Sequence, residues 1–220
     1  MRTLKYIAPV LIAVACLGLQ QAKAITTYSL TVANSAVSPY PAPYGSASVT
    51  LVGNTTATIT FTAANTAAYQ YLFGDGGSVA VNVNGAFTLG AITGTHLPGF
   101  SATTYTNGGA GNEDGLGSFN FSINSHDGYT ESSNSITFTL TGTWADDAHV
   151  LTANSQGFSV AAHIFVAAFP ANPNAGALAT GFAGDGLGTV PDGGSTVLLL
   201  GVALIGVALV RGRTLCAQKA

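Results

Sequence analysis

Apolar and polar residues alternate along much of the middle of the chain. Four segments show this pattern clearly, with an apolar side chain at every second position and Ser, Thr or Asn between them; they are residues 28–32, 57–62, 118–124 and 135–141. A period of two places successive side chains on opposite sides of a strand, one side facing a core and the other facing water. The pattern therefore predicts amphipathic β-strands at these positions.

A further pair of candidate strands, residues 78–83 and 87–92, is joined through Asn84-Gly85. Asn-Gly between two apolar runs is typical of a type I′ hairpin turn. Short strands separated by Gly-rich turns favour an antiparallel β-sandwich or a jelly-roll-like fold. We therefore predict a single all-β domain over residues 25–169, a length that is sufficient to bury a core.

Two segments lack the alternation. Residues 38–44 contain three prolines, which is typical of a polyproline-like connector. Residues 170–189 are rich in Pro, Gly and Ala, a composition typical of flexible linkers. We expect this second segment to form a flexible stalk that follows the β domain.

Residues 1–24 have the pattern of a secretory signal peptide. Arg2 and Lys5 precede an apolar run, and Ala22-Lys23-Ala24 provides the small residues of a cleavage site. We expect cleavage directly after Ala24, so that the chain is exported. The alternatives are an uncleaved anchor and a lipoprotein cut before Cys16.

The other end of the chain has three parts in order: a polar motif, an uninterrupted apolar run over residues 197–210, and Arg211 with Arg213. The run alone would form a helix about 21 Å long, short of the ~30 Å hydrocarbon core. We place a single thin transmembrane helix at residues 195–210. The arginines belong on the cytoplasmic side with the tail 214–220, which places the β domain outside.

This order of motif, short apolar helix and arginine cluster resembles the C-terminal sorting signals of exosortase substrates, the PEP-CTERM class, and most closely the VPDSG-CTERM variant. The positions that correspond to the variant are Val190, Pro191, Asp192, Gly194, Ser195 and Thr196, while Gly193 stands where the variant has serine. The motif spans 190–196, the arginine cluster 211–213, and the whole signal 190–213.

The resemblance implies a route for the protein. The tail would hold the exported chain in the inner membrane of a Gram-negative bacterium until a membrane-embedded exosortase-type enzyme recognises it. The protein would then reach the cell surface or the extracellular matrix, and exopolysaccharide would be a candidate partner. The tail is thus an address that is later removed, as in a GPI signal.

Charge is distributed unevenly along the chain. All six basic residues lie near the two ends, whereas all nine acidic residues lie between Ile25 and Val210. A body without Lys or Arg cannot neutralise nucleic-acid phosphates, so nucleic acid is excluded as a partner. Both cysteines, Cys16 and Cys216, lie in the terminal segments. The domain therefore has neither a disulfide nor a thiol for catalysis or for zinc binding.

The carboxylates suggest two interpretations, turns and calcium binding. Several of them precede glycine, and Asp-Gly is a common turn pair. Calcium takes oxygen ligands from loops, and it is the only cofactor that the sequence suggests. The weak calcium candidates are Asp75, Glu113, Asp114, Asp146 and Asp147. The Asp-x-Asp-x-Asp-Gly loop is missing, so we favour turns.

The histidines offer little support for catalysis. His126 neighbours Asp127, and His149 follows Asp147 by two residues, so either pair suggests a metal or acid–base site. His163 lies in an apolar run and is predicted to be a hydrogen-bonded core residue. The chain contains neither His-Glu-x-x-His nor Gly-x-Ser-x-Gly. We predict no enzyme activity, with a secreted hydrolase as the remaining alternative.

Two surface types complete the prediction. Aromatic residues in turn-like contexts are candidates for stacking on sugar rings; they are Tyr40, Tyr44, Tyr105, Tyr129 and Trp144. The threonine-rich runs 56–62 and 137–143 could mimic an ice-binding face, but such a face needs a regular repeat, which the two runs do not supply. The leading prediction is a structural or adhesive surface protein, and the alternative is a carbohydrate-binding module acting on exopolysaccharide, with or without calcium.

Overall fold

The computed structural model describes residues 25–101, 104–125, 128–186 and 190–191. The signal peptide, the helix 195–210, Arg211, Arg213 and the tail 214–220 lie outside these residues, as do the motif residues from Asp192 onward. Within the described part of the chain, no helix is long and apolar enough to cross a membrane.

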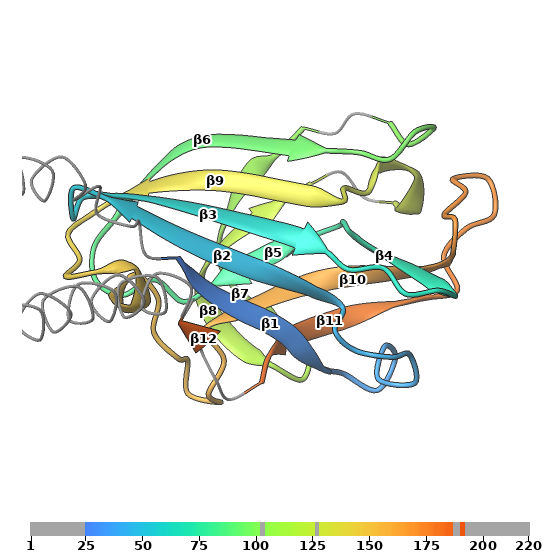
Figure 1. Ribbon diagram of the computed structural model, residues 1–220, viewed down its shortest axis with the longest axis horizontal. Helices are drawn as coiled ribbons and strands as arrows, with labels where there is room; N and C mark the ends of the chain where they lie inside the picture. The colour runs from blue at the N-terminus through green and yellow to red at the C-terminus, as the bar shows by residue number, and fades with distance from the viewer. Residues whose placement is uncertain (1–24, 102–103, 126–127, 187–189, 192–220) are drawn as a thin grey trace, which may run out of the picture. The chain divides into compact units, whose positions relative to one another are not determined.

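The described residues form an antiparallel β domain, which confirms the predicted fold class. One half of the domain is a run of five neighbouring strands, seen in front in Figure 1. In spatial order these are β6 (Thr88–Thr95), β9 (Ser135–Thr141), β3 (Thr56–Ala63), β2 (Gly45–Val52) and β1 (Thr26–Ala33).

The sheet continues from β1 into the second half, which lies behind the first in Figure 1. The order there is β11 (Ala179–Asp185), β10 (Val160–Ala168), β5 (Val79–Val81), β8 (Gly117–Asn124) and β7 (Thr106–Glu113), with β4 (Tyr69–Phe73) also paired to β10. Two short 3₁₀ helices, η1 (Tyr129–Glu131) and η2 (Asp147–His149), lie in the connections.

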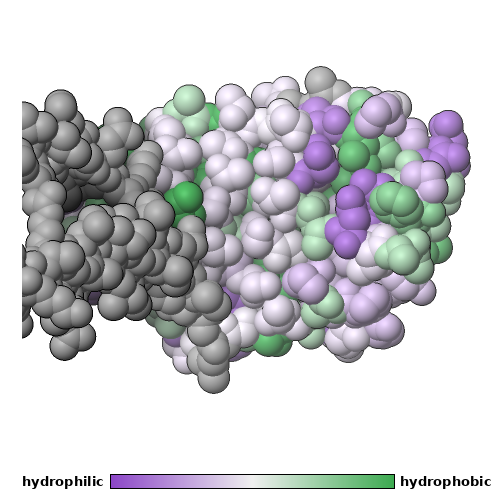
Figure 2. Space-filling model, in the orientation of Figure 1, coloured by the Kyte–Doolittle hydropathy of each residue, from purple (hydrophilic) through white to green (hydrophobic). Residues whose placement is uncertain are grey.

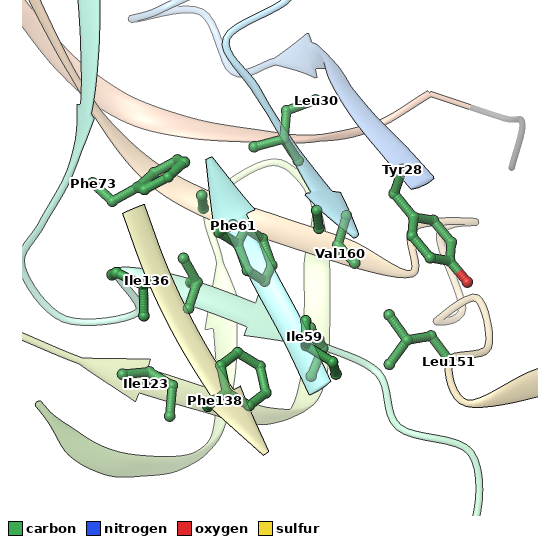
Figure 3. Packing of buried hydrophobic residues seen from close by; sticks show 14 of the residues in the cluster. Tyr28, Leu30, Ile59, Phe61, Phe73, Ile123, Ile136, Phe138, Leu151 and Val160 are labelled. Atoms are coloured by element: carbon green, nitrogen blue, oxygen red, sulfur yellow. The ribbon is translucent and has the colours of Figure 1, made fainter. Parts of the chain in front are cut away.

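The main core lies between the two halves and is built from the apolar positions of the alternating strands. In β9 the buried side chains are Ile136, Phe138 and Leu140, and the four remaining residues of that strand are more exposed. Phe61 of β3 stacks on Phe138 with ring centroids 6.4 Å apart, and Figure 3 shows both rings among aliphatic side chains. Burial of apolar area at roughly 25 cal/mol per Å² holds the halves together.

The predicted stalk is wrong for residues 179–185, because they form strand β11 between β1 and β10. Ala183 is fully buried, and a Cβ added to Gly184 would lie 3.0 Å from both Phe158 Cδ1 and the carbonyl oxygen of Val160. Small residues are required here because the strand is packed on both faces. The β domain therefore extends beyond residue 169, at least to Asp185.

The predicted hairpin at Asn84-Gly85 is also wrong. β5 pairs with β10 and β8, whereas β6 pairs with β9, so the connection crosses from one half of the domain to the other. Gly85 keeps the positive φ (83°) of a turn residue. Asn84 is bound instead by the loop that follows β9, since its carbonyl accepts a hydrogen bond from Trp144 Nε1 at 2.7 Å.

The two ends of the described domain lie side by side. β12 (Val190–Pro191) pairs with the start of β1, with Val190 opposite Thr27 and Pro191 opposite Thr26. The first two residues of the predicted sorting motif therefore belong to the β domain rather than to a separate linker.

Candidate functional site

The carboxylates predicted as calcium ligands do not come together. Among the residues that the structure describes, no group of three or more His, Cys, Asp or Glu side chains is placed to hold a metal ion. Each of the five candidates instead has its own surroundings, and these explain most of the positions without a metal.

Asp75 anchors the connection between β4 and β5. It has a positive φ of 62°, and its Oδ1 accepts a hydrogen bond from the backbone N–H of Gly128 at 2.6 Å. Its Oδ2 lies 3.4 Å from Nδ1 of His163. The predicted turn role is thus present, with a histidine beside it.

His163 is largely buried and hydrogen-bonded at both ring nitrogens, as predicted. Nδ1 lies 3.0 Å from the carbonyl oxygen of Gly74, and Nε2 lies 2.8 Å from Oγ1 of Thr180. Because a carbonyl only accepts, Nδ1 carries the proton and Nε2 accepts from the threonine hydroxyl. Burial lowers the pKa of His163, which keeps the ring neutral, and stacking on Phe182 at 4.6 Å fixes its plane.

Glu113 is the most unusual carboxylate of the domain. Only 3% of the residue is exposed, and burial raises its pKa from 4.5 to about 7. Gly77 has a positive φ of 65° and lies against this carboxylate, since an added Cβ would come within 2.5 Å of Oε1. The neighbouring Asp114 is exposed and accepts a hydrogen bond from Asn34 Nδ2 at 3.1 Å.

Asp146 and Asp147 have structural roles at η2. Asp146 accepts hydrogen bonds from the backbone N–H of His149 at 3.0 Å and from its ring Nδ1 at 2.6 Å. The side-chain bond to His149 is the main cause of the lowered pKa of Asp146. Asp147 is buried and accepts a hydrogen bond from Thr26 Oγ1 at 2.8 Å, which ties η2 to the start of β1.

Most of the predicted sugar-stacking aromatics belong to the core. Tyr44, Tyr129 and Trp144 are each less than 10% exposed. Tyr105 is half-buried, and its hydroxyl lies 2.6 Å from Ser133 Oγ. Tyr40 packs edge-on against Tyr69 at 5.1 Å. Turn-like sequence context did not distinguish these rings from surface aromatics, because loops fold back over the core.

The structure also joins the two threonine-rich runs noted in the sequence, 56–62 and 137–143, in one surface. On the outer side of the first half, serine and threonine residues of neighbouring strands lie directly opposite one another in rows. One row runs Ser29, Ser46, Thr62, Ser135, Thr95, and the next runs Thr27, Ser48, Thr60, Thr137, Thr93. We call these two rows, together with Thr50, Thr58, Thr139, Thr56, Thr141 and Thr88, the hydroxyl face.

The hydroxyl face follows the strands seen in front in Figure 1, and Figure 2 shows a broad pale surface of intermediate hydropathy over them. The side chains are half-buried or exposed, and Thr60 Oγ1 lies 3.0 Å from Thr137 Oγ1. The alternating threonines are visible within each strand in the sequence. Their alignment into rows depends on strand order and register, which local patterns do not specify.

Comparison with known proteins identifies the tail. Residues 189–213 match the family model described as the VPDSG-CTERM motif, so the predicted PEP-CTERM-type sorting tail is confirmed. The match covers the tail and does not extend into the β domain. Neither the curated proteins nor the solved structures include a match to this chain.

Proposed function

We propose that the protein is exported, held in the inner membrane by its tail, and then sorted to the cell surface or extracellular matrix, where the β domain has a structural or adhesive role. The match of residues 189–213 to the VPDSG-CTERM motif carries this proposal. A tail of this type implies processing by an exosortase-type enzyme and association with the membrane. The proposed environment is an exopolysaccharide matrix.

The geometry of the domain supports a structural rather than a catalytic role. Strand β12 starts the sorting motif and is paired with β1, so the folded domain directly adjoins the segment that the enzyme would recognise. This arrangement suits a protein that is presented close to its point of attachment. Asp75, Asp147 and His163 have partners that stabilise loops and strand pairs.

Intact mass and fractionation of the native protein test the proposal, in strains with and without the exosortase. We expect a mature chain that lacks both terminal segments and leaves the inner membrane only when the enzyme is present. Asp192→Ala in the motif should retain the precursor, whereas Asp114→Ala, a matched change in an exposed loop, should not. A chain that still carries residues 197–220 in both strains would contradict sorting.

A further inference from the structure

The hydroxyl face is a two-dimensional lattice. Adjacent strands of a sheet are about 4.8 Å apart, and residues i and i+2 of one strand are about 6.7 Å apart. Two complete rows cross all five strands of the first half, and each position in them is Ser or Thr. The Ser and Thr positions therefore repeat in both directions across the face. The hydroxyls of Ser48, Ser135 and Thr95 donate to Thr60 O, Phe61 O and Asn134 Oδ1, and keep their acceptor sides for a partner.

The side chains on this lattice are uncharged, and the threonines among them are stiff. Threonine is β-branched, so its χ1 angle is restricted and its hydroxyl and methyl groups are held in place. None of β1, β2, β3, β6 and β9 contains Asp, Glu, Lys or Arg. We therefore expect a neutral partner. Because the threonine side chains are already restricted, they would lose little conformational entropy when the partner binds.

A small ligand that contacts only one or two hydroxyls would bind the hydroxyl face weakly. A single hydrogen bond formed in water only replaces one made to water, so its net contribution is small. Sugar rings bind best when they stack on aromatic side chains, and the hydroxyl face has none. Appreciable affinity therefore requires a partner that meets many hydroxyls at once in a matching repeat.

We propose that the hydroxyl face binds ice. The surface of ice is an extended, neutral lattice of water oxygens that donate and accept hydrogen bonds, and a threonine hydroxyl has both a donor and acceptor capacity. An ice-binding face needs a regular repeat. The runs 56–62 and 137–143 do not supply one in the sequence, but the rows that they form with the neighbouring strands do. Because strands twist by about 20° relative to their neighbours, the best-matched area is centred on β2, β3 and β9.

Incorporation of the full-length protein into slowly growing ice tests the proposal, in detergent solution with a detergent-matched reference protein. We expect the wild type to enter the ice and the double variant Thr60→Tyr, Thr137→Tyr to lose about tenfold in partition, equivalent to about 1.4 kcal/mol. Tyrosine suits a strand surface, so folding should be preserved and is checked by circular dichroism. The matched control is Thr106→Tyr, at an exposed position of β7 in the second half.

A second variant distinguishes the contribution of the hydroxyl groups to ice binding from the contribution of the shape of the face. Thr60→Val with Thr137→Val keeps the branched side chains and should give an intermediate loss of ice partition. Exclusion of the wild type from ice to the same extent as the reference protein overturns the proposal. Equal partition of the wild type and the tyrosine variant also overturns it. Binding of the wild type to an insoluble neutral polysaccharide without entry into ice would assign the face to glycans instead.

Discussion

The two halves of the β domain differ in what covers their outer faces. Among the described residues nothing covers the hydroxyl face of the β6–β9–β3–β2–β1 half, so its strands alternate between buried and more exposed residues. In the other half the outer side is covered too, with Phe119 and Phe165 buried there, and β10 is buried along nearly its whole length. Alternation in a sequence thus reports how many faces of a strand are covered, rather than whether a strand is present.

The largest effect should come from the inner side of the open half. Phe138→Ala removes a fully packed ring that contacts Phe61, and we expect a loss of about 3–5 kcal/mol in the free energy of unfolding. Thr137→Ala, one residue away on the hydroxyl face, should cost less than about 1 kcal/mol, because the side chain is partly solvated. Urea denaturation measures both, and similar losses would contradict the assignment of inner and outer faces.

A pH-dependent effect should come from the covered half. The pKa of Glu113 is raised to about 7 in the folded protein, compared with 4.5 in an unfolded chain. Between these values the unfolded state releases a proton that the folded state retains, so the contribution of Glu113 to stability falls as the pH rises from about 4.5 to 7 and does not change above that range. The upper limit of this loss is about 3 kcal/mol.

Glu113→Gln removes the titration and keeps the shape of the side chain. We expect the variant to match the wild type near pH 4 and to be more stable at pH 8, by up to about 3 kcal/mol in urea denaturation. Asp114→Asn is the matched control, because it makes the same carboxylate-to-amide change at the neighbouring, exposed residue. A Glu113→Gln variant with the same pH profile as the wild type would show that this carboxylate is solvated.

The sequence predicted the parts of the fold that depend on local periodicity. Strands β3 and β9 lie where the alternation indicated them, because each has one open, more polar face. Strand β8 also lies at its predicted position, although its second half is buried at Ser122 as well as at Phe121 and Ile123. Strand β11 was missed, since a strand packed on both sides needs Gly and Ala and resembles a linker in composition. The Asn84-Gly85 turn was recognised as a turn, but its flanking strands pair with distant segments, a choice made by the whole core.

The candidate sites also divide into those that a local sequence pattern predicts and those that depend on contacts between distant segments. The tail motif is contiguous, so Val190 and the residues after it were sufficient to predict its class. The hydroxyl face depends on the register of five strands, and its residues are far apart in the sequence. The burial of Glu113 depends on the approach of Gly77, which no local pattern around either residue indicates.

The smallest predicted effect is the change in the free energy of unfolding caused by Gly184→Ala. Its sign distinguishes a packed strand from a flexible stalk at residues 179–185. Gly184→Ala would place a methyl group 3.0 Å from Phe158 Cδ1 and from a backbone oxygen, which is tighter than most Cβ contacts and requires these neighbours to shift. We expect a loss of about 1–2 kcal/mol in the free energy of unfolding, measured by urea denaturation. In a flexible stalk the same change would be neutral or stabilising, because alanine reduces the entropy of the unfolded chain.

Gly76→Ala supplies the matched control for this measurement. Its added methyl group would meet no atom within 4 Å, so the substitution should be neutral or stabilise the protein by up to about 1 kcal/mol. Opposite signs at Gly184 and Gly76 would establish that the Gly- and Ala-rich segment is packed on both faces. Equal, favourable changes at both positions would instead indicate that residues 179–185 are flexible. They would contradict the pairing of β11 with β1.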